Sequence, residues 1–151
     1  MNTFIPLRRV VLLLSGMVLL GLCACCSRTP APTVETTYKI TITYIAATGK
    51  LDYAVDKPGK KPKKLGVKRG DTVQWTCPDG EWKIYFKDRT PLVDPQTGAE
   101  LPSVSGAAYA TAGGEVSDKM KKGEEFEYGV SVVLTATGKK IEEDPRIFIE
   151  H

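Results

Sequence analysis

The chain has 151 residues, of which 42% are hydrophobic and 26% charged, and its formal net charge is +3. This length suits one small domain with a targeting segment, and the composition excludes wholesale disorder. Arg8 and Arg9 lie in a segment that we expect to be removed, and without them 19 basic residues face 18 acidic ones. The remaining charge of +1 gives no support for binding to nucleic acid.

Residues 1–24 have the pattern of a secretory signal peptide. The two arginines precede an apolar run, Val10–Leu22, which ends in small residues. This run is shorter than the roughly 20 residues that a helix needs to span a bilayer. The pattern therefore predicts a cleaved signal peptide rather than a transmembrane anchor.

The end of that run, Leu22-Cys23-Ala24-Cys25, resembles the bacterial lipobox. The resemblance implies cleavage after Ala24 and a diacylglyceryl thioether on Cys25, with acyl chains such as palmitate holding the protein in membrane lipid. An alternative frame that ends at Cys23 fits less well, because Leu22 is bulky next to the cut. In a bacterium with two membranes, Cys26 in place of aspartate favours the outer membrane, facing the periplasm.

Residues 25–36 are expected to form the lipidated cysteine and a flexible Pro/Thr-rich tether, and 37–151 the folded domain. The domain begins with a strand in which Tyr38, Ile40, Ile42 and Tyr44 share one face. A second, short strand is predicted over Leu51–Val55. Leu65 and Val67 are expected to belong to a short strand at a sheet edge.

The segment Lys57–Arg69 is the most distinctive surface feature, since seven of its thirteen residues are basic. The favoured interpretation is a solvated, proline-stiffened loop whose lysines protect a sheet edge from pairing. The alternative is attraction to anionic lipid, to another anionic envelope polymer or to a protein partner. The residues that would bind such a polyanion are Lys60, Lys61, Lys63, Lys64, Lys68 and Arg69.

Residues 72–87 predict a β-hairpin. Two alternating strands flank Pro78-Asp79-Gly80, in which glycine accepts a positive φ. The phase of the alternation makes both tryptophans core residues rather than a carbohydrate platform, and leaves Tyr85 as the better exposed aromatic. The side chains expected to face the core are Val73, Trp75, Cys77, Trp82, Ile84 and Phe86.

The remainder predicts a long irregular crossover over 88–114, a short strand over Glu115–Met120, and two strands near the C-terminus. The inward residues of these last strands are Phe126, Tyr128, Val130, Val132, Leu134, Ile147 and Ile149. About eight short strands without a helix indicate an all-β protein, an antiparallel β-sandwich.

Three patterns in this order, Val67–Trp75, Gly123–Val133 and Glu142–Glu150, resemble the strands of cupredoxins. The resemblance implies a Greek-key sandwich of the cupredoxin-like type. An immunoglobulin-like sandwich is the alternative fold.

Cupredoxins bind copper through two histidines, a cysteine and usually a methionine. The resemblance implies that the ligands come from residues after the first strand of the predicted hairpin and from the loop between the last two strands. Here 77–86 contains no histidine, and 130–146 contains no cysteine, histidine or methionine. The chain's one histidine is the terminal His151, and Cys77 is expected to be a buried core thiol. We therefore expect neither a metal site nor a cofactor.

No catalytic residues are predicted, because no histidine is available within the scaffold to activate a nucleophile. The late carboxylates are expected to form a solvated face and turn: Glu124, Glu125, Glu127, Glu142, Glu143 and Asp144. The sequence thus predicts a non-enzymatic, membrane-tethered envelope lipoprotein whose copper-free domain is a binding or structural module. The alternative is a periplasmic metal-handling or electron-transfer protein that uses copper.

Overall fold

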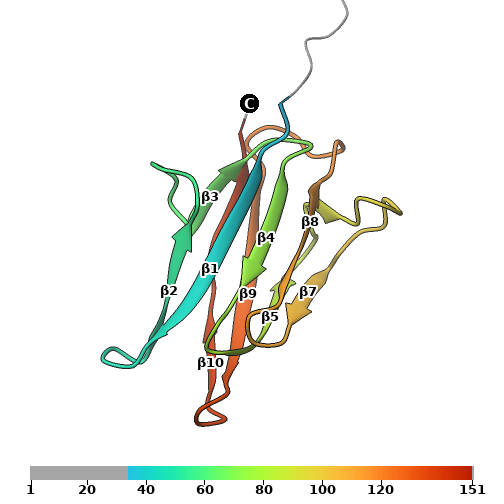
Figure 1. Cartoon of the computed structure of the whole chain (residues 1–151). Helices are drawn as coiled ribbons and strands as arrows, with labels where there is room; N and C mark the ends of the chain where they lie inside the picture. The colour runs from blue at the N-terminus through green and yellow to red at the C-terminus, as the bar shows by residue number, and fades with distance from the viewer. Residues whose placement is uncertain (1–33, 151) are drawn as a thin grey trace, which may run out of the picture. The chain divides into compact units, whose positions relative to one another are not determined.

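Eleven β-strands and no helix occur in the computed structural model, which describes residues 34–150 (Figure 1). The strands are β1 Thr37–Ile45, β2 Lys50–Val55, β3 Lys64–Val67, β4 Thr72–Thr76, β5 Gly80–Phe86, β6 Leu92–Val93, β7 Ser103–Gly106, β8 Thr111–Val116, β9 Glu125–Leu134, β10 Lys140–Glu143 and β11 Arg146–Ile149. None of the described residues lies in a helix long and apolar enough to cross a membrane. Pro32–His151 form a compact unit.

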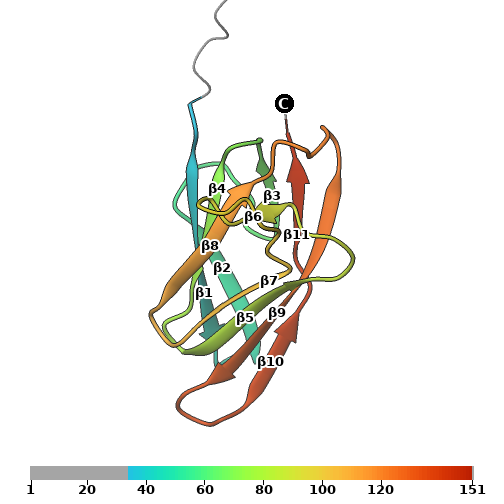
Figure 2. The same ribbon diagram turned by 90° about the vertical axis from the view of Figure 1, so that its right-hand side faces the viewer.

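The strands form two layers, as Figure 2 shows from the side. One sheet has the order β2-β1-β4-β8-β6, and the other has the order β3-β11-β9-β5-β7, with β10 paired to part of β9. The all-β sandwich predicted from the sequence is confirmed at this level. The expectation of purely antiparallel sheets is wrong, because β1 runs parallel to β4 and β3 runs parallel to β11.

The two parallel pairs follow from how the chain changes sheets. After the β1–β2 hairpin, every connection from β2 to β9 passes from one sheet to the other. Parallel neighbours need a long connection between them, and here the opposite sheet supplies it. Short-range hydrophobic alternation carries no information on such pairing.

Both strands of the predicted hairpin exist, but the prediction that they pair with each other is wrong. β4 pairs with β1 and β8, whereas β5 pairs with β9 and β7 in the other sheet. The turn after Cys77 therefore carries the chain across the core. Gly80 begins β5 without a positive φ, and a Cβ at this position would collide with the backbone carbonyl of Val133 on β9. Its role is to permit close approach of two strands.

The crossover predicted over 88–114 is not irregular throughout, since it contains β6, β7 and the first residues of β8. The predicted strand Glu115–Met120 overlaps only the last residues of β8. Its preceding residues, Ala112, Gly113 and Gly114, are poor strand formers, so the strand carries little sequence signal. A Cβ at Gly113 would collide with the Val73 carbonyl, so β8 needs glycine there to approach β4.

The core between the sheets contains the inward residues expected from the alternation. Trp75, Trp82 and Cys77 are all buried, as predicted. Trp75 lies edge-on to Tyr128 with ring centroids 5.9 Å apart, and Phe86 lies 5.8 Å from the same ring. Burial raises the pKa of Tyr128 well above its ordinary value. Among residues 34–150, the buried side-chain polar atoms without a hydrogen-bond partner are Tyr53 Oη, Trp75 Nε1, Trp82 Nε1 and Tyr128 Oη.

Candidate functional site

The lysine-rich segment forms the loop after β2, strand β3 and the turn that leads into β4. Gly59 at φ 77° and the flanking prolines shape the loop. Leu65 and Val67 are fully buried, and β3 is an edge strand of its sheet, as predicted. The edge position fits the interpretation that charged side chains protect this strand from pairing with another chain.

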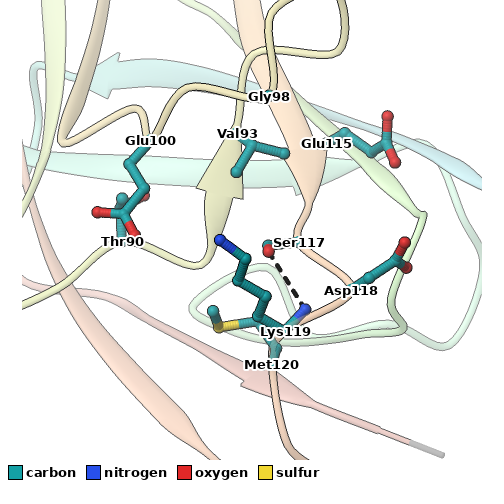
Figure 3. Close-up of a pocket in the computed structure, with 9 residues that line it drawn as sticks. All are labelled: Thr90, Val93, Gly98, Glu100, Glu115, Ser117, Asp118, Lys119 and Met120. Carbon is teal, nitrogen blue, oxygen red and sulfur yellow. Dashed lines mark hydrogen bonds between the residues drawn. The ribbon is translucent and has the colours of Figure 1, made fainter.

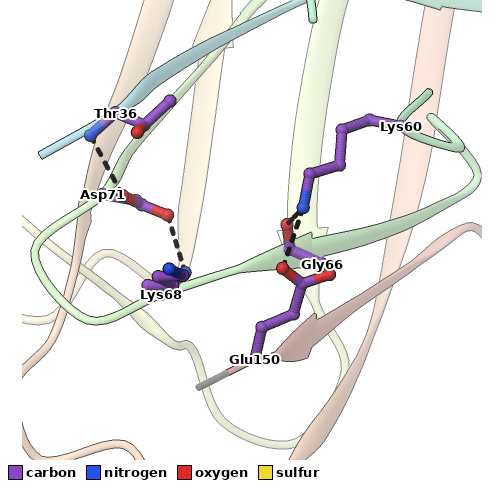
Figure 4. Close-up of polar contacts among 6 residues, drawn as sticks. All are labelled: Thr36, Lys60, Gly66, Lys68, Asp71 and Glu150. Carbon is purple, nitrogen blue, oxygen red and sulfur yellow. Dashed lines mark hydrogen bonds and ion pairs between the residues drawn. The ribbon is translucent and has the colours of Figure 1, made fainter. Parts of the chain in front are cut away.

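Lys60 is held by contacts within the domain. Its Nζ donates to the Gly66 carbonyl at 2.9 Å and to Glu150 Oε2 at 2.8 Å (Figure 4), and it lies 5.5 Å from the centre of the Tyr38 ring. Partial burial alone would lower the pKa of Lys60, but the hydrogen bond and charge of Glu150 raise it above the ordinary value. Lys60 is therefore a structural cation that ties the loop to the C-terminal strand.

Lys63 and Lys64 are also paired with carboxylates. Lys63 Nζ contacts Glu143 Oε2 at 2.8 Å, and Lys64 Nζ contacts Glu125 Oε1 at 3.0 Å. Both ammonium groups also lie over aromatic rings, at 5.0 Å from the Tyr53 centroid and 5.6 Å from that of Phe148. Much of the charge expected to attract a polyanion is thus balanced inside the domain.

The other three candidates, Lys61, Lys68 and Arg69, differ from this group. All three are exposed, and none makes an ion pair with any residue in 34–150. The structure therefore divides the six predicted residues into three paired lysines and three cations that are open to an external partner.

The turn between β3 and β4 is fixed by Asp71, which is only 2% exposed. Its carboxylate accepts hydrogen bonds from Thr36 N at 3.0 Å and Lys68 N at 2.7 Å (Figure 4). Gly70 adopts a φ of 80°, which favours glycine. Asp71 thus joins the turn to the residue before β1, where the chain enters the sandwich.

The late carboxylates are exposed or half-buried as expected, but they are paired rather than merely solvated. Glu125 and Glu127 on β9 both contact Arg146 on β11, which links neighbouring strands. All six carboxylates make ion pairs, with these partners: Glu124 with Arg89, Glu125 with Lys64, Glu127 with Lys87, Glu142 with Lys140, Glu143 with Lys63 and Asp144 with Lys87. Most of these side chains are largely exposed, so each ion pair contributes little to stability.

A pocket of about 220 Å³ beside β6 and β8 was not predicted from the sequence (Figure 3). Its buried hydroxyls are engaged with the backbone: Thr90 Oγ1 accepts from Leu92 N at 3.0 Å, and Ser117 Oγ accepts from Lys119 N at 3.3 Å. It is lined by Thr90, Val93, Gly98, Glu100, Glu115, Ser117, Asp118, Lys119 and Met120. These nine residues include no histidine or cysteine, so they do not form a nucleophile activated by an adjacent imidazole.

Sequence reasoning also missed the aromatic side chain that is most exposed among residues 34–150. Tyr85 is half-buried, with its ring over Gly129 on the adjacent strand. Tyr109, between β7 and β8, is 77% exposed and has a φ of 64°, which is uncommon for a residue other than glycine. Its N–H donates to the Cys77 carbonyl at 2.9 Å, which ties this turn to the connection between β4 and β5.

Cys77 is a buried free thiol in that connection. Burial raises its pKa above the ordinary value, although hydrogen bonds from the backbone of Asp79 and Gly80 oppose the shift. Residues 34–150 contain no cluster of three or more histidine, cysteine, aspartate or glutamate side chains arranged to hold a metal ion. His151 and the cysteines near the N-terminus lie outside the described residues.

We expect Cys77 in the folded Pro32–His151 unit to react slowly with a disulfide reagent at pH 8. The thiol is buried, and its raised pKa keeps it protonated, whereas the thiolate is the reactive form. The unit contains no other cysteine, so absorbance from the released thiol reports this site alone. The reaction in denaturant should be at least about 100-fold faster, because reaction of the native protein requires opening of the core. Equal rates in the two conditions would contradict the core assignment.

Comparison with known proteins adds no family assignment: no protein-family model and no curated protein gives a match to this chain.

Proposed function

We propose that this protein is a lipid-anchored component of the bacterial cell envelope, with a copper-free, cupredoxin-like sandwich that acts as a non-enzymatic binding or structural module. The observation that carries the proposal is the lipobox-like segment Leu22–Cys25 after an apolar run. Only eight residues, 26–33, separate Cys25 from Val34, where the described domain begins. A tether of this length keeps the domain within roughly 30 Å of its anchor.

The strand arrangement supports the cupredoxin-like type. Seven successive connections cross between the sheets, from β2 through to β9, which is the kind of connectivity that Greek-key sandwiches use. The parallel pairs β1–β4 and β3–β11 favour this type over an immunoglobulin-like sandwich, whose sheets are antiparallel.

The distribution of side chains supports a module without copper or catalysis. The chain from Leu134 to Arg146, where cupredoxins place most of their ligands, has no cysteine, histidine or methionine. Cys77 is buried in a connection between sheets, and the pocket beside β6 lacks an imidazole base. The module would act through its surface, on an anionic envelope polymer or a protein partner and not on nucleic acid. We place it on the outer membrane, facing the periplasm, because Cys26 follows the proposed lipidated residue.

Metabolic labelling with palmitate tests the anchor. We expect the Cys25→Ser variant, expressed in a bacterium with lipoprotein processing, to lose the label and to accumulate as the uncleaved precursor. The Cys23→Ser variant is the matched control and should remain labelled, because it changes only the tolerant position of the lipobox. The reverse result would assign lipidation to Cys23, and labelling of neither wild type nor control would contradict the proposed anchor.

A copper titration separates the proposal from the metal-handling alternative. The Pro32–His151 unit should bind no copper tightly at neutral pH, and its visible absorbance should not change. Stoichiometric binding accompanied by a thiolate-to-copper absorbance band would overturn the copper-free assignment, and the Cys77→Ser variant would show whether this thiol is the ligand.

A further inference from the structure

Four chain segments meet at the end of the sandwich where the tether enters, and we call this end the tether end. They are residues 34–36, 68–71, 117–124 and 149–150. Backbone hydrogen bonds join them in a chain: Thr72 N to Thr36 O, Gly70 N to Val116 O and Gly123 N to Ile149 O, each at 2.9 Å. Figures 1 and 2 show that both ends of the described chain lie at the tether end.

Exposed cations that are not neutralised gather at the tether end. Segments 68–71 and 117–124 contribute five such residues. Lys61 lies beside them and lines a shallow pocket with Phe148 and Glu150. The set is Lys61, Lys68, Arg69, Lys119, Lys121 and Lys122, which are all exposed and make no ion pair with another described residue.

The carboxylates at the tether end only partly offset this charge. Glu124 is engaged by Arg89 at 2.9 Å and by Lys121 N at 2.9 Å, and Glu150 is engaged by Lys60. Asp71 is buried, and its carboxylate accepts hydrogen bonds from two backbone N–H groups. Glu35 and Asp118 are exposed and make no ion pair with residues 34–150. Within the four segments, five open cations therefore stand against two open carboxylates. Lys61 beside them adds a sixth cation, and Glu100 and Glu115, which line the same pocket as Lys119, add two carboxylates that are unpaired among residues 34–150 (Figure 3).

This asymmetry exists in a unit without net charge. Arg8, Arg9 and Arg28 precede the Pro32–His151 unit, so 18 of the 21 basic residues remain, against 18 acidic ones. Attraction of this unit to an anionic surface therefore depends on where its charges lie, rather than on their total.

We propose that the tether end is a membrane-docking surface, on which the domain lies against anionic phospholipid headgroups. This rests on the proposed lipid anchor, because the anchor lies at most nine residues from the tether end and delivers it to the bilayer. Within a Debye length of about 10 Å, the unpaired cations are attracted to headgroup phosphates. The opposite end, which includes Tyr109, then points away from the membrane. The membrane contact is then made by the exposed cations of 68–71 and 117–124, and not by the paired lysines Lys60, Lys63 and Lys64.

Vesicle sedimentation of the Pro32–His151 unit tests the docking surface without the anchor. This unit should bind vesicles containing phosphatidylglycerol at about 0.01 M salt, and more weakly at about 0.1 M because salt screens the charges. It should not bind vesicles of pure phosphatidylcholine. The triple variant Lys119→Gln, Lys121→Gln, Lys122→Gln should lose binding by roughly fivefold per cation, and so by roughly 100-fold in total. These side chains are exposed, so thermal unfolding should stay unchanged and show that the variant is folded.

The matched control is the triple variant Lys50→Gln, Lys83→Gln, Lys139→Gln, whose lysines are also exposed and unpaired among residues 34–150 but lie outside the tether end. It changes the net charge equally and should keep binding within about fivefold of the wild type. Equal loss in both variants, or no binding to the anionic vesicles at low salt, would overturn the proposal. Binding to lipopolysaccharide with none to phosphatidylglycerol would also overturn it, in favour of a polymer partner. Palmitate labelling of the full chain tests the anchor separately, so the two proposals fail independently.

Discussion

Replacement of Trp75 by alanine should lower the free energy of unfolding by about 4 kcal/mol, measured by urea denaturation followed by circular dichroism. Trp75 is fully buried between the sheets and packs edge-on against Tyr128. Its removal leaves a cavity next to a ring that also contacts Phe86. The indole nitrogen makes no hydrogen bond within residues 34–150, so Trp75→Phe should cost less than half as much.

Tyr109→Ala is the control for this core prediction. Tyr109 is an aromatic residue of the same domain, but its side chain is mostly exposed, so the substitution should change the stability by no more than about 0.5 kcal/mol. Similar losses for the two alanine variants would show that Trp75 does not occupy the core position described.

The second large effect is expected at Asp71. Alanine at this position should lower the free energy of unfolding by about 3 kcal/mol, because two partly buried N–H groups lose the charged acceptor that the buried carboxylate provides. Asp71→Asn should cost less, since one side-chain oxygen remains to accept a hydrogen bond. Thermal unfolding and hydrogen exchange at Thr36 and Lys68 measure the loss of stability and the local opening of the turn.

Asp94 provides a matched comparison for Asp71. Its carboxylate accepts hydrogen bonds from Gln96 N and Thr97 N, at 2.8 and 2.9 Å, but these bonds lie within one exposed loop. Asp94→Ala should therefore cost clearly less than Asp71→Ala. An equal cost would mean that the link from Asp71 to the first strand adds nothing to stability.

The sequence predicts which side chains face the core better than it predicts which strands are neighbours. Alternation places Trp75 and Trp82 inward, and both are buried. The same alternation suits two strands paired in one sheet and two strands that face each other across the core. Pro78-Asp79-Gly80 can serve either arrangement. In the structure, Asp79 Oδ2 accepts from Tyr44 N at 2.6 Å, a long-range contact that fixes the crossing and has no local sequence signal.

The candidate surface was predicted only in part for a similar reason. The lysine-rich segment is obvious in the sequence, but Lys60 and Glu150 are 90 residues apart, and Lys63 and Glu143 are 80 apart. Folding brings these partners together and removes much of their charge from the candidate surface. The turn at Lys119–Lys122 has no obvious connection to that segment in the sequence. It joins the surface because Gly70 N bonds to the Val116 carbonyl just before it.

The position of β1 has a mechanical consequence. This first strand lies inside its sheet, between β2 and β4, and is hydrogen-bonded on both sides. A pull on the chain ahead of residue 34 acts along the strand, so both rows of bonds bear the load together in shear instead of opening one after another. A domain tethered to a membrane through this strand would therefore resist unfolding by a force applied to the opposite end of the domain.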